Sequence, residues 1–600
     1  MKVQRAMFLL VAFAMYSITK SVALASPQNS TYTNPILPGW HSDPSCVFVA
    51  EENNTFFCTT SSFLTFPGIP IYASQDLVHW KLVSNVFTRP EQVPEIANST
   101  SQTQQDGLWA STIRYRNGKF YLVTSYASTY PSFKVVSGFL FTSTNIYSDD
   151  SWTDPIRFAI RDIDPDLFWD DDGTAYISRA GIVQQTIDLE TGVLGPETKI
   201  WAGTGGATPE GPHIYKKDGW HYLMISEGGT ELNHRVTIAR SKNVTGPYEG
   251  YSGNPILTNS NTSEYFQTVG HADLFQDSDG NWWGIALATR SGPAWRVYPM
   301  GRETVLFAVT WGEGEWPVLE PVQGQMTGWK LPQPSKGKGI PGNGAYVDAP
   351  DHITFGPGTS IPRHFLYWRP PKGSFTVSPP ESPCSLRLLP SSQNLTGTGV
   401  PGVDVNETAI TLITRRQSHT YFTFSVDITY APTVEGEEAG VTIFLTQDQH
   451  IDLGIVLLSS EGKLIPHVRF QTALLNDLNT PATENVTVPE TVVKPLPSSS
   501  PKEVRARLQL QAKDDTHYIL SATLSDDKQF EFSQTAEAAL VSGGTGRFTG
   551  KDILTYVYPS ANRDAIGTLL GTYATSNGGS GSTPAYITQW QYEGHGQKIS

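Results

Sequence analysis

The chain has 600 residues, and 57 acidic against 42 basic side chains give it a formal net charge of −15. Hydrophobic residues make up 38% and charged residues 16%, which is typical of a globular protein with a large core and excludes a disordered one. The acidic balance argues against a nucleic-acid or an anionic-membrane partner, because no basic surface would attract phosphates.

The N-terminus has the pattern of a secretory signal peptide over residues 1–25. Lys2 and Arg5 are basic, the run 7–15 is apolar but too short to cross a bilayer, and Ala23 and Ala25 supply small residues before the expected cleavage at Ser26. A buried N-terminal helix fits this order of segments less well. We therefore expect a secreted, extracellular protein with no membrane-spanning segment.

Glycosylation sequons agree with export. The Asn-x-Ser/Thr pattern occurs at Asn29, Asn53, Asn98, Asn243, Asn261, Asn394, Asn406 and Asn485, which predicts a glycoprotein. The cysteines are Cys46, Cys58 and Cys384. Cys46 and Cys58 flank a polar turn, so either a disulfide across a hairpin or two buried thiols would fit.

A repeated unit follows, in which an apolar strand, a turn rich in Asn, Asp and Gly, and an aromatic strand succeed one another. Asn-Gly and Asp-Gly favour tight hairpins because both residues tolerate positive φ. A unit of roughly 45–65 residues with several short strands is typical of a propeller blade. The turns lie at 53–54, 117–118, 172–173, 218–219 and 279–280. The chain is therefore predicted to be all-β, with a five-bladed β-propeller over residues 26–330; an irregular array of β-sandwiches fits the regular spacing less well.

A polar cluster precedes each turn, at the expected start of a strand. If that strand is the innermost of its blade, the five clusters form a ring at one mouth of the central axis, and three carboxylates meet there. The clusters are Asp43-Pro44-Ser45, Trp109-Ala110-Ser111, Asp164-Pro165-Asp166, Glu210-Gly211-Pro212 and His271-Ala272-Asp273. Isolated capping or surface carboxylates would not recur at equivalent points of successive units.

Residues 331–350, rich in Pro, Gly and Lys, are predicted to be a linker. Beyond them, segments such as 421–430, 439–446, 450–458 and 504–510 alternate apolar and polar residues, which predicts a C-terminal β-sandwich over 351–600. No second catalytic cluster is visible in this half.

Several stretches resemble glycoside hydrolase family 43, and in particular its two-domain members with a C-terminal sandwich. They are the segments 34–45, 61–63, 66–72, 163–168, 209–215, 227–230 and 301–304, and in the second half 413–417 and 437–440. The resemblance implies an inverting β-xylosidase or α-L-arabinofuranosidase on a five-bladed propeller, with a loop of the sandwich that helps close the pocket and favours removal of single terminal sugars.

The resemblance also implies roles for individual residues. Asp43 would be the general base and Glu210 the general acid, while Asp164 would orient the acid and tune its pKa. Arg302 would contact a sugar hydroxyl, although an ion pair with Glu303 is an alternative.

The remaining candidates belong to the floor and walls of the pocket. His271 would lie on the axis and bind water or a calcium-type ion, or it is a core histidine. Trp40, Phe66 and Trp109 would stack on sugars, or they belong to the core. No cofactor is expected to be required, and no metal-ligand motif is present.

These observations predict a secreted, inverting exo-glycosidase that removes terminal β-D-xylose or α-L-arabinofuranose from xylan or arabinoxylan fragments of the plant cell wall. Two alternatives remain. One is a non-catalytic carbohydrate-binding propeller, against which the three carboxylates argue. The other is a retaining, fructosidase-like propeller that would form a covalent intermediate.

Overall fold

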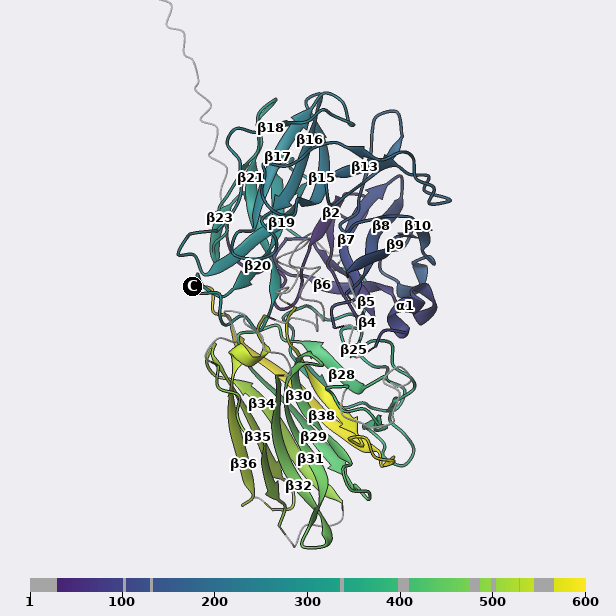
Figure 1. The fold of residues 1–600 in the computed structure, drawn as a ribbon, viewed down its shortest axis with the longest axis vertical. Coiled ribbons are helices and arrows are strands. Elements are labelled where there is room, and N and C mark those ends of the chain that lie inside the picture. Colours follow the sequence, from purple (N-terminus) through teal and green to yellow (C-terminus); the bar gives the residue numbers. More distant parts are fainter. Residues whose placement is uncertain are drawn as a thin grey trace, which may run out of the picture.

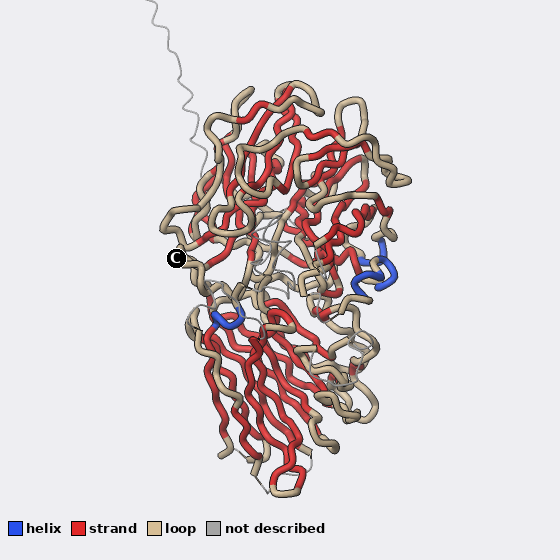
Figure 2. The backbone as a smooth tube through the Cα atoms, in the orientation of Figure 1, coloured by secondary structure: helices blue, strands red, loops and turns tan. Residues whose placement is uncertain are grey.

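The computed structural model describes residues 30–100, 104–129, 133–334, 339–397, 409–474, 486–497, 503–527, 529–543 and 566–600. The expected signal peptide and the sequons at Asn29, Asn406 and Asn485 lie outside these residues. Figures 1 and 2 show two bodies made almost entirely of strands, one above the other. The described helical segments are short: η1 (Pro90–Gln92), α1 (Pro94–Ala97), η2 (Asp149–Ser151) and η3 (Ala538–Val541). Among the residues in these ranges, no helix has the length and apolarity needed to cross a bilayer.

The upper body consists of five antiparallel sheets of four strands, each built from consecutive strands of the chain apart from β4. The blades are β2 (Ser45–Val49), β3 (Thr55–Thr59), β5 (Gly68–Ser74) and β6 (Lys81–Phe87); β7 (Gly107–Arg116), β8 (Lys119–Ser128), β9 (Lys134–Ser143) and β10 (Ile156–Phe158); β11 (Asp166–Trp169), β12 (Ala175–Arg179), β13 (Val183–Thr186) and β14 (Thr198–Lys199); β15 (Glu210–Lys217), β16 (Trp220–Glu227), β17 (Arg235–Ser241) and β18 (Glu249–Gly250); and β19 (Phe266–Gln276), β20 (Trp282–Arg290), β21 (Arg302–Thr310) and β22 (Val318–Leu319).

The first strands of the blades form a closed ring. β2 contacts β7, β7 contacts β11, β11 contacts β15, β15 contacts β19, and β19 returns to β2. The five-bladed propeller is thus confirmed, with the first strand of each blade innermost. Outside the five blades, β1 (Ser30–Thr33) pairs with β23 (Gln325–Gly328) in a separate two-stranded sheet.

The predicted hairpin turns join the first and second strands of the blades. Asn53, Asn117 and Asp218 have φ between 51° and 59°, the left-handed region that Asn and Asp tolerate best. In the first of these hairpins Cys46 lies directly opposite Cys58, and the two form a disulfide between β2 and β3. This resolves the alternatives for that pair; Cys384 is an exposed free thiol.

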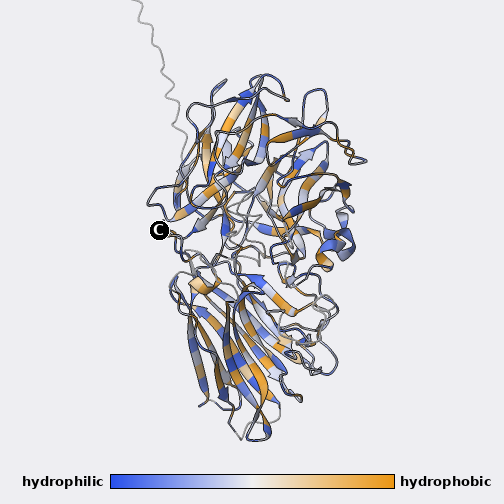
Figure 3. Ribbon diagram, in the orientation of Figure 1, coloured by the Kyte–Doolittle hydropathy of each residue, from blue (hydrophilic) through white to orange (hydrophobic). Residues whose placement is uncertain are grey.

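The lower body is a sandwich of two eight-stranded sheets. Apolar and polar residues alternate along many of its strands (Figure 3), as expected where one face of each sheet is buried. One sheet contains β24 (Asp351–Ile353), β26 (Phe375–Val377), β27 (Leu386–Leu388), β29 (Tyr421–Tyr430), β34 (Val504–Ala512), β35 (His517–Leu524), β36 (Glu531–Glu537) and β38 (Ala585–Gly596); the other contains β4 (Thr65–Phe66), β25 (Leu366–Trp368), β28 (Thr411–Arg416), β30 (Glu438–Thr446), β31 (Gln449–Ser460), β32 (Lys463–Leu474), β33 (Val492–Pro495) and β37 (Leu569–Thr575).

The two bodies are joined by backbone pairing as well as by side chains. β4 leaves blade one and pairs with β25, so a propeller segment forms the edge of a sandwich sheet. Within the expected linker, Ala345 and Val347 exchange backbone hydrogen bonds of 3.0 Å with Leu82 and Trp80 of blade one. One hydrophobic core runs from the first two blades into the sandwich.

Candidate active site

The innermost strands share one backbone feature at the mouth of the axis. Each blade has a residue with left-handed φ at the beginning of, or within, its innermost strand, and the ladder register shifts next to this residue in blades two, four and five. Such bulges aim side chains out of the regular pleat. These residues are Asp43 (φ 52°), Ala110 (44°), Asp164 (61°), Gly211 (56°) and His271 (50°).

This ring corrects the equivalence predicted from the sequence in two respects. The counterpart of Asp43 and Asp164 in blade four is Gly211, so Glu210 lies one residue earlier. His271 lies in the middle of β19 rather than at its start. In blades four and five the physical reason is a bulge: an inserted residue moves the polar cluster along the strand without changing the order of residue types.

Asp43 is buried at the entry to β2, between two donors. Ser61 Oγ donates to its Oδ2 at 2.5 Å, and Arg302 Nη1 donates to its Oδ1 at 2.8 Å. Burial alone would raise the pKa of Asp43, but the positive charge of Arg302 and the Ser61 hydrogen bond outweigh it and lower that pKa. Asp43 is therefore held as an anion. Ser61, to which the sequence analysis gave no role, also accepts a 2.7 Å hydrogen bond from the backbone N–H of Ala110.

Arg302 begins β21 and pairs with Asp43, not with its neighbour Glu303. Because successive residues of a strand point to opposite faces, Glu303 faces away from the site and pairs with Arg290 at 2.5 Å. The alternative of an Arg302–Glu303 ion pair is therefore wrong. Contact of Arg302 with a sugar hydroxyl stays a prediction.

Asp164 and Glu210 are connected through the backbone of β15. Asp164 Oδ2 accepts a 3.0 Å hydrogen bond from the N–H of Gly211, the residue after Glu210. Burial, and next the negative charge of Asp43, hold the pKa of Asp164 well above its usual range. Glu210 itself is 9% exposed at the first position of β15. Asp164 thus fixes the chain at the point from which the Glu210 side chain projects.

The loop before Glu210 is held by Glu227, at the end of β16. Its carboxylate accepts from the N–H groups of Thr204 and Gly206 at 2.9 and 3.0 Å, and from the Thr237 hydroxyl at 2.8 Å. Glu227 was matched to the family from the sequence but given no role; its contacts make it a positioning residue for that loop.

His271 lies beside Asp164, with Nδ1 4.0 Å from Oδ2. Burial lowers the pKa of His271 to about 4, although the Asp43 charge opposes this shift, so the ring is neutral at neutral pH. Ser226 Oγ accepts a 2.6 Å hydrogen bond from the backbone N–H of His271, which ties blade five to blade four.

Below this ring, Arg114 fills the axis. Its guanidinium donates to Asp166 at 2.6 Å and to Asp273 at 3.0 Å, and Nη2 lies 3.1 Å from Nδ1 of His213. A calcium-type ion near His271 stays a prediction; calcium needs six to eight oxygen ligands, and Asp166 and Asp273 are engaged by Arg114. In the described residues no cluster of three or more His, Cys, Asp or Glu side chains is suited to a metal ion.

The aromatic candidates separate into two groups. Phe63 lies between Trp40 and Trp109: its ring centroid is 5.6 Å from that of Trp40 and 5.2 Å from that of Trp109. The Arg302 guanidinium lies 5.7 Å from the Phe63 centroid. Phe63, within a matched stretch but not singled out, thus adjoins the carboxylate site. Phe66 instead lies in β4, at the junction with the sandwich, and its ring packs on Phe87 at 5.2 Å. Sugar stacking by any of these rings stays a prediction.

The sandwich reaches the rim of this site through the residues that lead into β37. The N–H of Thr568 donates to the carbonyl of Pro299 at 2.8 Å, and an added Cβ on Gly567 would lie 2.3 Å from the Met300 carbonyl and 2.8 Å from Cβ of Trp40. Only glycine therefore lets the segment approach so closely.

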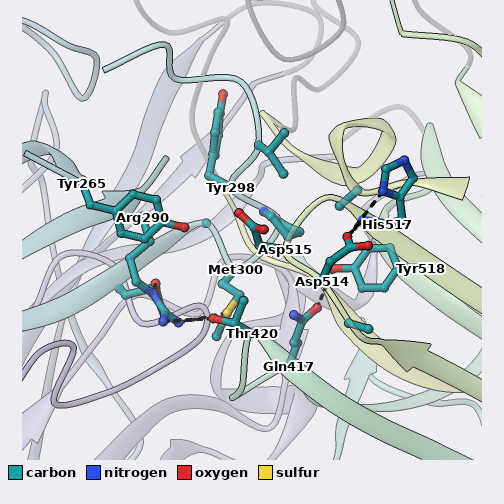
Figure 4. Close-up of a pocket in the computed structure, with 16 residues that line it drawn as sticks. Tyr265, Arg290, Tyr298, Met300, Gln417, Thr420, Asp514, Asp515, His517 and Tyr518 are labelled. Carbon is teal, nitrogen blue, oxygen red and sulfur yellow. Dashed lines mark hydrogen bonds and ion pairs between the residues drawn. The ribbon is translucent and has the colours of Figure 1, made fainter. Parts of the chain in front are cut away.

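A second link runs through Arg290. Arg290 binds Glu303, whose carboxylate accepts a hydrogen bond from the N–H of Gly39 at 2.6 Å. Arg290 also donates to three groups of the sandwich: the Thr420 hydroxyl, the Gln597 side chain and the Lys598 carbonyl. Figure 4 shows Arg290 and Thr420 meeting in a pocket between the bodies, with Asp514 and His517 on its sandwich side. The segment that carries Trp40 is thus held from the sandwich.

Comparison with known proteins gives the class of this chain. The model of the family "Glycosyl hydrolases family 43" matches residues 32–317, and that of the "Beta xylosidase C-terminal Concanavalin A-like domain" matches residues 354–593. A non-reducing end α-L-arabinofuranosidase of Bacteroides ovatus, BoGH43B, is 31% identical over 571 residues, which cover 94% of this chain and 95% of the relative. The chain therefore belongs to glycoside hydrolase family 43 and is a glycoside hydrolase.

Further relatives share the two-domain architecture. A xylosidase/arabinosidase of Butyrivibrio fibrisolvens is 33% identical over 70% of this chain and 79% of its own. The solved structure of the Bacteroides ovatus xyloglucan PUL GH43B has a TM-score of 0.74 at 29% identity, over 94% of this chain and 99% of that chain. The xylan β-1,4-xylosidase from Bacillus halodurans C-125 has a TM-score of 0.75 at 25% identity, over 94% of this chain and 99% of that chain.

Proposed function

We propose that this glycoside hydrolase is a secreted, inverting exo-glycosidase that removes terminal β-D-xylose, α-L-arabinofuranose or both from xylan or arabinoxylan fragments of the plant cell wall. The relatives named above carry both activities in their names. Both sugars present similar hydroxyl edges, so one pocket accepts either. The observation that carries the proposal is the anionic Asp43, held between Arg302 and Ser61 in the same ring as Asp164.

The roles follow from the environments of the carboxylates. Inversion needs a base that is ionised before the reaction, and Asp43 is kept so by Arg302. Asp43 takes a proton from a water molecule as that water attacks the anomeric carbon. Glu210 gives its proton to the glycosidic oxygen of the leaving group, and the bond from that oxygen to the anomeric carbon breaks.

Asp164 is a positioning residue in this scheme. Through the N–H of Gly211 it fixes the direction of the Glu210 side chain, and its raised pKa leaves Asp43 as the carboxyl that ionises first. The contact of the segment 566–568 with Trp40 and Met300 supports an exo mode of action, because a pocket closed on one side accepts a chain end.

The stereochemistry and the substrate are tested together. Proton NMR during hydrolysis of an aryl β-D-xyloside should show α-xylose first, and the aryl α-L-arabinofuranoside should be turned over as well. β-Xylose as first product would replace inversion by a retaining mechanism with a covalent intermediate. Binding of xylo-oligosaccharides without turnover of either glycoside would instead indicate a carbohydrate-binding propeller.

The absence of a required cofactor and the extracellular location are parts of the same proposal. Activity should survive dialysis against EDTA, and a loss that calcium restores would contradict the first part. N-terminal sequencing of the protein recovered from culture medium should begin at Ser26. A protein that stays inside the cell with residues 1–25 still attached would contradict the extracellular location.

A further inference from the structure

Within the part of the chain that the structure describes, the buried cation Arg416 has no carboxylate partner. Arg416 is the last residue of β28 and is 8% exposed, and its guanidinium lies 5.8 Å from the ring centroid of Trp40. Among the residues that the structure describes, no hydrogen-bond acceptor is in reach of its Nε or Nη2. Leaving two nitrogens of a buried guanidinium unpaired costs free energy, so the retention of Arg416 calls for a partner.

Arg416 lines a pocket of about 30 Å³ between blade one and the sandwich. His41 and Tyr72 come from the propeller side, Ala345 from the segment that follows it, and His364 and Arg415 from the sandwich side. Asp43, Asp164 and Glu210 are absent from this lining, so the pocket is separate from the carboxylate site.

The ionised side chains that line the pocket leave it with a net positive charge. Arg415 is neutralised by Asp351 at 2.8 Å, and His364 lies 3.0 Å from the same carboxylate. Within the described ranges, no carboxylate lies within 4.0 Å of Arg416. Burial and the Arg416 charge lower the pKa of His41, whose Nε2 is 2.7 Å from the Tyr72 hydroxyl. His41 is thus neutral and supplies no opposing charge.

We infer that this pocket is a binding site for a small inorganic anion of the size of chloride, held by the guanidinium of Arg416. A space of about 30 Å³ has room for a particle about as large as one or two water molecules, which is the size of a monatomic anion. A water molecule would accept the hydrogen bonds of Arg416 but would leave its charge uncompensated, whereas a halide does both. The anion would lie behind Trp40 and His41 and join blade one to the sandwich.

The direct test uses bromide, which scatters anomalously and substitutes for chloride. Crystals of the full-length protein soaked in sodium bromide should give an anomalous peak at hydrogen-bonding distance from the Arg416 guanidinium. A data set with bromide peaks elsewhere and none in this pocket would overturn the inference. This measurement needs no variant and so does not depend on whether a substitution folds.

A second test measures stability in solution. The melting temperature of the wild-type protein should be higher by at least ~2 °C in sodium chloride than in sodium gluconate of equal ionic strength, because bulky gluconate does not match a space for one or two water molecules. Arg416→Gln should abolish this difference. Arg505→Gln, which removes an exposed guanidinium, is the matched control and should keep it. Equal melting temperatures of the wild type in the two salts, or a difference that survives in Arg416→Gln, would reject the site.

Discussion

The propeller and the sandwich are both built from antiparallel strands, yet they use left-handed residues differently. In the propeller Asp43, Asp164 and His271 have positive φ at the axis, at the beginning or within the innermost strands. In the sandwich, Glu461 and Asn577 have positive φ in turns between strands, and Gln589 has it within β38, away from the propeller axis. The contrast teaches that the polar side chains of this enzyme gather where inner strands depart from regular geometry, and that regular strands serve packing.

The two regions also differ in how they treat buried carboxylates. In the sandwich, Asp452 pairs with His450 at 2.8 Å and Asp351 pairs with Arg415 at 2.8 Å. In the propeller, Asp43 and Asp164 belong to one ring, and their pKa values shift in opposite directions. Unequal environments for neighbouring carboxyls are what acid–base chemistry requires.

Replacing one buried aspartate in each domain tests this contrast most strongly. Asp43→Asn should lower kcat/KM by ~10³- to 10⁴-fold on aryl xyloside and aryl arabinofuranoside alike, because no general base remains. Asp452→Asn, buried beside His450, should leave kcat/KM unchanged and lower only the melting temperature. Near-normal turnover by Asp43→Asn would remove it from the role of base.

Glu210→Gln sharpens the assignment within the propeller. Because the acid matters most for a poor leaving group, kcat on xylobiose should fall by ~10²- to 10⁴-fold, but by less than ~10-fold on a dinitrophenyl xyloside. The ratio of the two losses is the measurement, so each substrate serves as a control for the other. Equal losses on both substrates would argue that Glu210 does not protonate the leaving oxygen.

Glu303→Gln tests the junction, where a propeller side chain depends on the sandwich. Its loss leaves the buried Arg290 without its carboxylate, so the free energy of unfolding measured in urea should fall by about 3 kcal/mol. Glu503→Gln, from an exposed pair with Arg505, should leave the urea midpoint unchanged. If both variants unfold like the wild type, the Arg290 link contributes nothing to stability.

Arg302→Met addresses the electrostatics of Asp43 through the pH profile. Arg302 lowers the pKa of Asp43, so without it Asp43 stays protonated to higher pH, and the acid limb of kcat/KM should move to higher pH. Arg507→Met, whose guanidinium pairs with Asp427 on the sandwich surface, should leave the limb in place. An acid limb that does not move would show that Arg302 has no part in keeping Asp43 ionised.

The sequence predicts those features that local patterns determine. The turn at 117–118 and the strand Tyr421–Tyr430 follow from hairpin residues and from alternation, and both are present. The offset of Glu210 relative to Gly211 could not be predicted, because a bulge changes register without changing composition. The central position of Arg114 could not be predicted either. It depends on contacts with Asp166 and Asp273, which only the closed ring of strands brings next to it.

Pairing between strands that are far apart in the chain could not be predicted from the sequence either. Phe66 fits an aromatic wall by its motif, yet β4 pairs with β25, some three hundred residues later in the chain. Nothing in the local sequence distinguishes a short strand that lines a pocket from one that joins another domain. The role of Ser61 could not be predicted either, because it depends on hydrogen bonds with Asp43 and with the backbone N–H of Ala110.

The pairing of β4 with β25 also bears on whether the enzyme can be divided. Without residues 65–66, strand β25 would present open N–H and C=O groups, and such unprotected borders invite association with other chains. A recombinant sandwich produced by itself should therefore be prone to aggregate, and a recombinant propeller would lose the neighbour that holds β4 in place. The halves of this hydrolase are better regarded as one folding partnership than as interchangeable modules.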